Sequence, residues 1–420
     1  MDGTGKTSVR ASYALSFEDY PLQMRHGESI GQPPWASNIM LQFPAGGLDD
    51  PWRGIPGGNP FPFQLTVNST FPATGGVYQA QRTDIAPTYI GSWNLTVQRQ
   101  LAKAWLLSAS YLGSETTHLW AQISLNPALY YPGTNCTLPN GTVVSGTCST
   151  LANTDVRRKL AQVNLAEGRG IGRMSEYVFG GTQNYNGMLL SLQHRPTRGV
   201  AVTGNYTFAH CIGDYAGRSS RGVSLGADET YQDANNRRLD RSNCISDVRH
   251  AVNLTATAAS PEFAGNHTLH LIGSGWRLSA IYKRTTDTFL SATSGVDRQL
   301  SDIQSQRPDQ VKANIYQDKS KRPLTQYLDP TAFAFPALGS LGNMGRLNIA
   351  APGTWQFDTA LSRVFAFREK QSLEFRAEAY NVTNSFRPGN PNVAFNNNTF
   401  GQIRTSLAPR ITQFALKYIF

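Results

Sequence analysis

The chain has 420 residues, a formal net charge of +10, and 40% hydrophobic against 16% charged residues. No stretch approaches the roughly 18 consecutive apolar residues of a membrane-spanning helix, which excludes a helical span. The lysines and arginines are scattered along the sequence rather than gathered into a dense basic run, so nucleic acid is not expected as a partner.

Ten stretches alternate apolar and polar residues with a period of two, which predicts β-strands with one apolar and one polar face. In chain order they cover about 8–17, 89–98, 105–111, 188–192, 200–208, 248–255, 276–282, 355–361, 373–379 and 413–420. The strands form hairpins with short turns, such as those near 102–103 and 196–199. This pattern predicts an all-β fold, an antiparallel transmembrane β-barrel with about ten strands present.

Long connections link one hairpin to the next, at about 19–88, 119–182, 212–246, 285–353 and 384–409. Loops of this length are rare in compact soluble domains. Short turns at one end and long loops at the other are typical of outer-membrane barrels, whose long loops lie outside the cell. We therefore expect the outer membrane of a Gram-negative cell, with lipid around the strands.

Charged residues on the strand before the last also indicate two different faces. Glu374, Arg376 and Glu378 alternate with apolar residues, and each would cost several kcal/mol if it faced lipid near the midplane. They are expected to face a polar lumen. Arg363 interrupts the apolar face of its own strand near the predicted periplasmic end, where the cost is small.

The four cysteines are expected to form two disulfides in an oxidising compartment. Cys136 and Cys148 lie in one long loop, whereas Cys211 ends a strand and Cys244 nearly begins the next. The predicted pairs are Cys136–Cys148 and Cys211–Cys244, and the topology places both outside the cell.

No catalytic constellation, metal site or cofactor site is predicted. Residues 222–226 match the G-x-S-x-G nucleophile elbow, but they lie in a charged, glycine-rich stretch rather than between a strand and a helix. Gly5-Lys6-Thr7 lacks the rest of a phosphate-binding loop. The acidic residues around 227–240 do not have the spacing of a calcium loop. The chain is therefore not expected to be an enzyme.

Several segments resemble the C-terminal barrel of TonB-dependent receptors, in particular the subgroup with an N-terminal carboxypeptidase-regulatory-like domain that is common in soil acidobacteria. The resemblance covers nearly the whole chain and rests on the order of its motifs. These are 92–99 (SWNLTVQR), 110–114 (SYLGS), 247–250 (DVRH), 327–330 (YLDP) before Gly342-Asn343, 355–358 (WQFD) and 373–384 (LEFRAEAYNVTN).

The resemblance implies an active transporter in a plugged barrel of about 22 strands. The first six residues do not have the features of a signal peptide, and no plug precedes the first strand, so the chain is expected to be the C-terminal portion of such a barrel over 1–420. Contact with the TonB complex would then pass through a missing N-terminal plug. The resemblance also implies that the terminal apolar row Phe414, Leu416, Tyr418 and Phe420 is the signal read by the barrel-assembly machinery.

The function expected from these observations is TonB-dependent transport of a scarce nutrient, an oligosaccharide or a metal chelate. Trp35 and Trp52, in the first long loop, are candidates for stacking on such an extracellular ligand, although packing within the loop is the favoured role for both. The alternative in the same membrane is an adhesin or surface scaffold that transports nothing. A secreted all-β enzyme or binding domain is the remaining alternative, and solubility without detergent would distinguish it.

Overall fold

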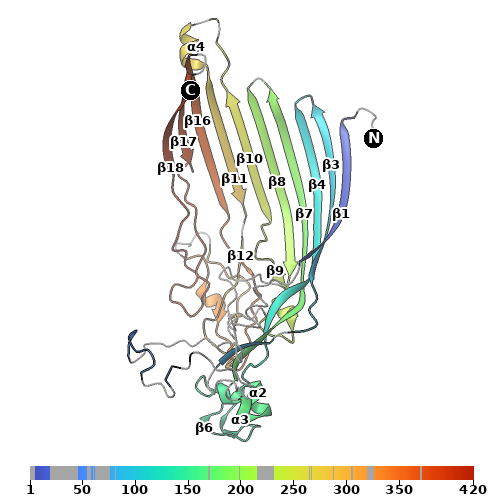
Figure 1. The fold of residues 1–420 in the computed structure, drawn as a ribbon, viewed down its shortest axis with the longest axis vertical. Helices are drawn as coiled ribbons and strands as arrows, with labels where there is room; N and C mark the ends of the chain where they lie inside the picture. The colour runs from blue at the N-terminus through green and yellow to red at the C-terminus, as the bar shows by residue number, and fades with distance from the viewer. Residues whose placement is uncertain are drawn as a thin grey trace.

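A computed structural model describes most of the chain and builds it around one large sheet (Figure 1). The described residues are 5–18, 46–53, 58–59, 61, 76–80, 82–168, 171–197, 199–214, 231–263, 265, 267–286, 288–303, 306–318, 326–368 and 371–420. The predicted all-β fold is confirmed.

Ten strands lie side by side in the order of the sequence, each antiparallel to the next. They are β1 (Thr7–Glu18), β3 (Thr88–Ala102), β4 (Trp105–Ser124), β7 (Ile171–Thr197), β8 (Val200–Gly213), β10 (His250–Ala259), β11 (Trp276–Thr285), β16 (Thr354–Arg368), β17 (Gln371–Tyr380) and β18 (Ile411–Ile419). Two short strands, β2 (Gly76–Ala80) and β9 (Ser242–Asn243), pair with β7 and β8.

The register keeps one face of the sheet apolar across neighbouring strands. Leu278 of β11 lies opposite Leu361 of β16, which lies opposite Ala377 of β17 and then Phe414 of β18. These side chains stand out from the sheet rather than pack in a core, and Phe414 is 74% exposed. A row of exposed apolar side chains on one face is the arrangement that lipid requires.

The opposite face carries polar side chains in the same register. Ser12 of β1 pairs with Asn94 of β3, and the Asn94 side-chain amide donates to the Ser12 hydroxyl at 2.6 Å. On the next pair of strands, Thr96 donates to Ser110 at 2.9 Å. The alternation seen in the sequence therefore separates a lipid-facing side from a hydrogen-bonded polar side.

The connections at the two ends of the sheet differ in length (Figure 1). β3 and β4 are joined through 103–104, β7 and β8 through 198–199, and β16 and β17 through 369–370. The described parts of the connections 125–170, 214–249, 286–353 and 381–410 lie at the other end of the sheet. We call the two ends the turn end and the loop end.

Two features depart from the expected pattern. β4 and β7 continue their pairing to Ser124 and Ser175, well inside the connection expected at 119–182. Side chains on both faces of these extensions are buried, which stabilises the extended pairing. At the turn end, the connection between β10 and β11 runs over 260–275 and contains a helix, α4 (His267–Gly273), rather than a short turn.

The remaining elements are short and most lie in the long connections. They are β5 (Thr134–Thr137), β6 (Val143–Thr147), η1 (Asp155–Arg157), α2 (Lys159–Val163), α3 (Leu165–Gly168), η2 (Arg237–Asp240), β12 (Phe289–Leu290), β13 (Asp309–Gln310), η3 (Pro330–Ala332), β14 (Phe333–Ala334) and β15 (Ile349–Ala350). No helix in the described part of the chain is long and apolar enough to cross a membrane.

The main apolar core lies among the long connections rather than within the sheet. Its buried members are Ala292, Ile315, Leu328, Ala332, Phe333, Met344, Ile349 and Phe400. Phe333 and Phe400 meet edge to face, with ring centroids 4.8 Å apart. This cluster joins the connection at 286–353 to the one at 381–410, so these loops fold together.

Candidate ligand-contact layer

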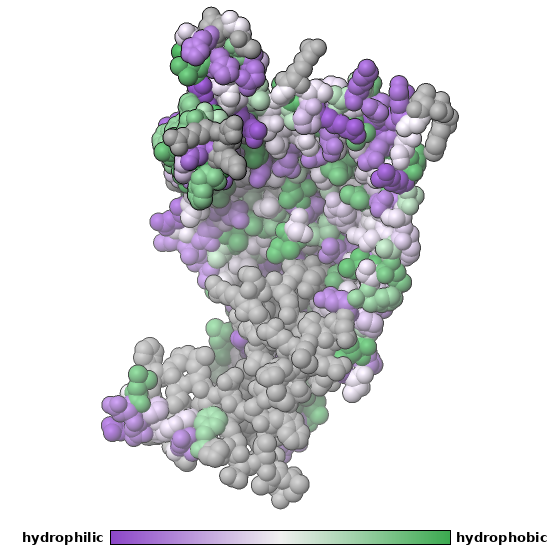
Figure 2. All heavy atoms as spheres, turned by 45° about the horizontal axis from the view of Figure 1, so that its top comes forward, coloured by the Kyte–Doolittle hydropathy of each residue, from purple (hydrophilic) through white to green (hydrophobic). Residues whose placement is uncertain are grey.

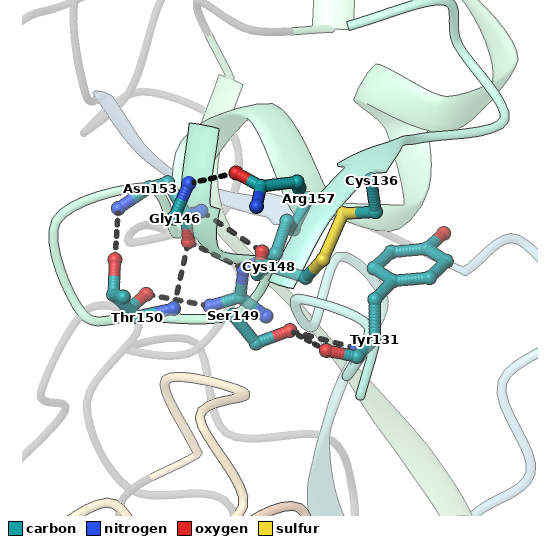
Figure 3. The surroundings of a disulfide bond; sticks show 9 residues. Tyr131, Cys136, Gly146, Cys148, Ser149, Thr150, Asn153 and Arg157 are labelled. Atoms are coloured by element: carbon teal, nitrogen blue, oxygen red, sulfur yellow. Dashed lines mark hydrogen bonds between the residues drawn. A yellow bond between two sulfur atoms is a disulfide. The ribbon is translucent and has the colours of Figure 1, made fainter. Parts of the chain in front are cut away.

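We define the loop layer as the described residues of the connections 125–170, 214–249, 286–353 and 381–410. Its outermost part is the β5–β6 hairpin, closed by the Cys136–Cys148 disulfide with Cα atoms 5.9 Å apart (Figure 3). Beside the disulfide, Asn153 donates to the Cys148 carbonyl at 2.9 Å and Ser149 donates to the Tyr131 carbonyl at 2.9 Å. The hairpin is therefore fixed at its base by both covalent and hydrogen bonds.

Arg157, at the end of η1, is fully buried and holds two connections together. Its guanidinium donates to the carbonyls of Leu129, Thr150 and Leu300, the last at 3.0 Å from the connection 286–353. Burial lowers the pKa of this guanidinium. A buried arginine whose hydrogen bonds go mainly to backbone carbonyls fixes the conformation of the loops and is not a candidate ligand contact.

Asp302 forms a second tie between the same two connections. Arg158 donates to one of its carboxylate oxygens at 2.7 Å, and Arg173 of β7 donates to both oxygens at 2.5 and 2.9 Å. Burial alone would raise the pKa of Asp302, but the hydrogen bonds and charges of the two guanidinium groups outweigh it and hold the pKa below the ordinary 3.8. The carboxylate is thus charged at neutral pH.

Asp240, at the end of η2, ties the connection 214–249 to 286–353. Its fully buried carboxylate accepts from Arg307 at 2.5 Å, and Arg346 lies 3.8 Å from the same oxygen. The other oxygen accepts from the Gln232 backbone at 3.0 Å, and the Gln232 side chain donates to the Gly342 carbonyl at 2.9 Å. The site is a closed ionic network with its partners supplied by the chain itself.

The second disulfide, Cys211–Cys244, joins the end of β8 to the turn before β10, with Cα atoms 5.3 Å apart. Asp247 reinforces it, because its carboxylate accepts from the Cys211 backbone at 2.9 Å while its own N–H donates to the Cys244 carbonyl. Both cysteine pairs are those expected from the sequence, and both lie at the loop end of the sheet.

Exposed aromatic side chains lie where two of the connections meet. Tyr130 is 37% exposed, Phe335 is 42% exposed and Leu338 is 50% exposed. The Tyr130 ring packs directly on Gly339, where an added Cβ would lie 2.2 Å from the ring. Arg298 places its guanidinium 5.8 Å from the Phe335 centroid and donates to the Pro336 carbonyl at 2.8 Å. We call Tyr130, Phe335, Leu338 and Arg298 the aromatic patch.

The aromatic patch has the chemistry of a small-ligand contact surface. Aromatic faces and a guanidinium can stack on the apolar faces of sugars or on planar chelating groups, and the arginine adds a positive charge. Its residues come from connections that are distant in sequence, and the sequence did not predict them as site residues. No local sequence pattern marks these residues, because the contact of Tyr130 with Gly339 joins two separate connections.

The sequence named two tryptophans, Trp52 and Trp35, as candidate ligand aromatics. Trp52 is partly buried and its ring centroid is 6.1 Å from that of Phe61, which fits packing within the loop. Trp35 lies outside the described residues. Trp52 is therefore not among the residues of the aromatic patch, and a ligand role for either tryptophan remains a prediction.

The predicted lumen charges share one face of β17. Arg376 lies 2.7 Å from Glu378 and 3.9 Å from Glu374, and the Gln413 amide of β18 donates to Glu378 at 2.5 Å. The neighbouring residues Leu373 and Phe375 point to the apolar face, opposite Tyr418 and Leu416. A lumen-facing role for the three charges remains a prediction.

The terminal apolar row Phe414, Leu416, Tyr418 and Phe420 is exposed along β18, with Phe420 the most exposed at 90%. Its role as an assembly signal remains a prediction. Within the residues that the structure describes, no group of three or more His, Cys, Asp or Glu side chains is placed to hold a metal ion.

A family model described as an outer membrane beta barrel domain matches residues 1–413. Among solved structures, the chain is similar to the outer membrane transporter YddB from Escherichia coli, with 11% identity, a TM-score of 0.46, and 99% of this chain against 39% of that chain covered. It is also similar to the ferric-catecholate import receptor Fiu from E. coli K12, with 13% identity, a TM-score of 0.39, and 99% against 33% covered.

A third similar structure is BauA, the ferric preacinetobactin receptor from Acinetobacter baumannii, with 11% identity, a TM-score of 0.41, and 100% of this chain against 35% of that chain covered. No curated protein sequence matches the chain. The chain therefore spans between a third and two fifths of the length of these three solved proteins.

Proposed function

The chain belongs to the outer membrane beta barrel domain family and is an outer-membrane protein, and on this premise we propose that it takes part in TonB-dependent import of a scarce nutrient. In this proposal it supplies barrel wall and extracellular loops, and its cargo is an oligosaccharide or a metal chelate. The N-terminal plug that contacts the TonB complex belongs to the same proposal, as does the acidobacterial subgroup suggested by the sequence.

One observation carries the proposal: the long connections form a tied, folded layer at one end of a lipid-facing sheet, and the layer exposes an aromatic patch. A barrel that served as a membrane anchor alone would need no buried Asp240–Arg307 pair or Arg157 network to order its loops. Pre-ordered loops reduce the entropy lost when a small ligand binds. The arrangement therefore favours ligand capture at the loop layer.

Uptake by Gram-negative cells that produce the protein in its native gene context tests the proposal. We expect accumulation of a labelled oligosaccharide or ferric chelate that stops when the proton-motive force is dissipated. Tyr130→Ala and Phe335→Ala should each reduce accumulation about tenfold or more, because truncating an aromatic anchor costs about 2 kcal/mol or more and about 1.4 kcal/mol corresponds to a factor of ten. Leu151→Ala, at a 66% exposed position of the same connection as Tyr130, is the matched control and should leave uptake unchanged.

The alternative is an adhesin or surface scaffold, and the same cells distinguish it. Binding of a ligand or surface at the loop layer with no energy-dependent accumulation of any member of the panel would support the alternative and overturn the transport proposal. Loss of uptake in Leu151→Ala as well would show that the aromatic patch is not the contact surface.

A further inference from the structure

The helix α4 at the turn end is unusual, because the other strand connections at that end, 103–104, 198–199 and 369–370, span only two residues each. The connection is ordered by its own hydrogen bonds: Ser260 donates its backbone N–H to the Trp276 carbonyl at 2.8 Å, and the Phe263 N–H donates to the Ser274 hydroxyl at 3.0 Å. Phe263 also closes against Gly273, where an added Cβ would lie 2.9 Å from the ring. The helix therefore has a fixed position at the end of β10 and β11.

The side chains that hold α4 come from the lipid-facing side of the sheet. Arg363 is aligned with Phe375 and Trp276 in the apolar rows of β16, β17 and β11. Its guanidinium donates to the carbonyls of Leu271 and Ile272 at the end of α4, the latter at 3.2 Å. The Trp276 indole N–H donates to the same Ile272 carbonyl at 2.7 Å. The helix is thus fastened over the lipid-facing side and not over the polar side.

Arg363 is positioned for this role by two aromatic rings of the same apolar side. Its guanidinium carbon lies 5.3 Å from the Trp276 ring centroid and 4.5 Å from that of Phe365. The Arg363 guanidinium lies between these rings and two carbonyls. The residue is therefore only 9% exposed although it stands on an apolar row. Arg363 interrupts the apolar pattern of its strand in the sequence, and in the structure its guanidinium binds the end of α4.

The helix itself presents apolar side chains outward. Leu269 is 52% exposed, Leu271 is 61% exposed and Ile272 is 62% exposed. Figure 2 brings the turn end forward and shows hydrophobic side chains next to hydrophilic ones over this end of the molecule. Three large exposed aliphatic side chains in seven residues, continuous with the lipid-facing rows of the barrel, form an apolar surface that water would not favour.

We propose that α4 is an interfacial anchor that inserts Leu271 and Ile272 into the lipid leaflet at the turn end of the barrel. The occupant of this surface is phospholipid, because the surface continues the lipid-facing rows through Trp276, Arg363 and Phe365. Helices that lie in this plane bury their apolar side about 5–10 Å into the boundary between headgroups and acyl chains. His267, His270 and Glu262 supply the polar groups that remain in the headgroup region, with His270 3.3 Å from Glu262.

The test places a fluorescent label on single introduced cysteines in the full chain, reconstituted in vesicles of phosphatidylethanolamine with a minority of phosphatidylglycerol. Ile272→Cys is compared with Leu361→Cys, on the lipid-facing side in mid-strand, and with Val143→Cys, 74% exposed on the loop-end hairpin. We expect brominated lipid to quench the label at 272 most strongly when the bromine lies near the glycerol backbone. The label at 361 should be quenched most by bromine deeper in the acyl chain, and the label at 143 by aqueous iodide alone.

Adding Arg363→Gln to Ile272→Cys should reduce quenching by shallow brominated lipid severalfold, whereas Arg363→Lys should retain most of it. The Leu361→Cys label serves as the control for insertion, since neither substitution should change its quenching. If the label at 272 behaves like the one at 143, with iodide quenching and no lipid quenching, α4 lies in water and the anchor is refuted. Equal lipid quenching with and without Arg363→Gln would refute the positioning role of Arg363.

Discussion

The buried carboxylate of Asp240 gives the sharpest test of how the loop layer is held together. In the folded protein it faces Arg307 at 2.5 Å and Arg346 at 3.8 Å, and the two arginine side chains are 4% and 6% exposed. Asp240→Asn keeps the size of the side chain but removes the charge and one acceptor. Two buried guanidinium groups then lose their counter-ion, which typically costs about 3–5 kcal/mol.

The expected loss lies near the lower end of that range, because Arg307 keeps its bonds to the carbonyls of Met344 at 2.8 Å and Leu239 at 3.0 Å. A loss of about 3 kcal/mol raises the equilibrium constant for opening of the layer by roughly two orders of magnitude. Hydrogen exchange measures this constant at individual amides. The Met344 N–H, which donates to the Pro308 carbonyl at 3.2 Å, is a suitable reporter inside the layer.

The matched control is Lys312→Gln. Lys312 pairs with Asp329 at 2.9 Å in the same connection, but its side chain is 50% exposed. Exposed ion pairs contribute less than about 1 kcal/mol, so exchange at Met344 should change little. The amides of β16 and β17 should be unaffected in both variants, because the sheet does not depend on the network. Equal exchange at Met344 in Asp240→Asn and Lys312→Gln would refute the claim that the buried network orders the loops.

Three further predictions concern pH, the two faces of the sheet and its last residue. Because the pKa of Asp302 is held below 3.8 in the folded protein, its charged carboxylate stabilises the fold at neutral pH, and this stabilisation is lost as the pH falls below 3.8. In hydrogen exchange, Asp302→Asn should therefore show weaker protection of the loop-layer amides than the native chain at about pH 7. The loss of protection on acidification should be smaller in the variant than in the native chain. Leu361→Arg, on the lipid-facing side, should lower the free energy of unfolding of the inserted barrel by about 2–4 kcal/mol in denaturant titrations in lipid. Ala360→Arg, on the polar side, should lower it by less than about 1 kcal/mol. Equal losses would contradict the assignment of the two faces. If the terminal apolar row is an assembly signal, Phe420→Ala should lower the amount of protein in isolated outer membranes. Lys417→Gln, on the other face of β18, is the control and should leave this amount unchanged. Unchanged amounts in both variants would argue against a role of the terminal row in assembly.

The strands in the membrane were predictable because lipid contacts one face and polar groups the other. This contrast produces a period of two in the sequence, which β17 follows residue by residue and which β16 follows with an interruption at Arg363. The extension of β4 past its predicted end was missed for the opposite reason. Trp120, Ala121 and Gln122 are successive residues and all are 6% exposed or less, so both faces are covered and the alternation disappears.

The loop layer was harder to predict because its charges look like those of a solvated loop. Nothing local distinguishes Arg157, which is fully buried and bonds to a carbonyl 143 residues away, from an exposed arginine. The cysteine pairs could be predicted because Cys136 and Cys148 share one connection, whereas Cys211 and Cys244 lie at the two ends of another. The aromatic patch could not be predicted from the sequence, since Tyr130 and Phe335 come together through the folding of two separate connections.

The ties within the loop layer also constrain how a ligand could pass it. Arg157 and Asp302 join the connection 125–170 and β7 to 286–353, Asp240 joins 214–249 to the same segment, and Phe333 joins it to 381–410 through Phe400. The segment 286–353 therefore lies at the centre of the layer, and a separate movement of any one neighbour would break a buried ionic or aromatic contact. Since breaking a buried ion pair costs about 3–5 kcal/mol, opening of a connection that requires it would be populated at below about one per cent. If the protein imports its ligand, the described connections of the loop layer are expected to move as one body rather than one at a time.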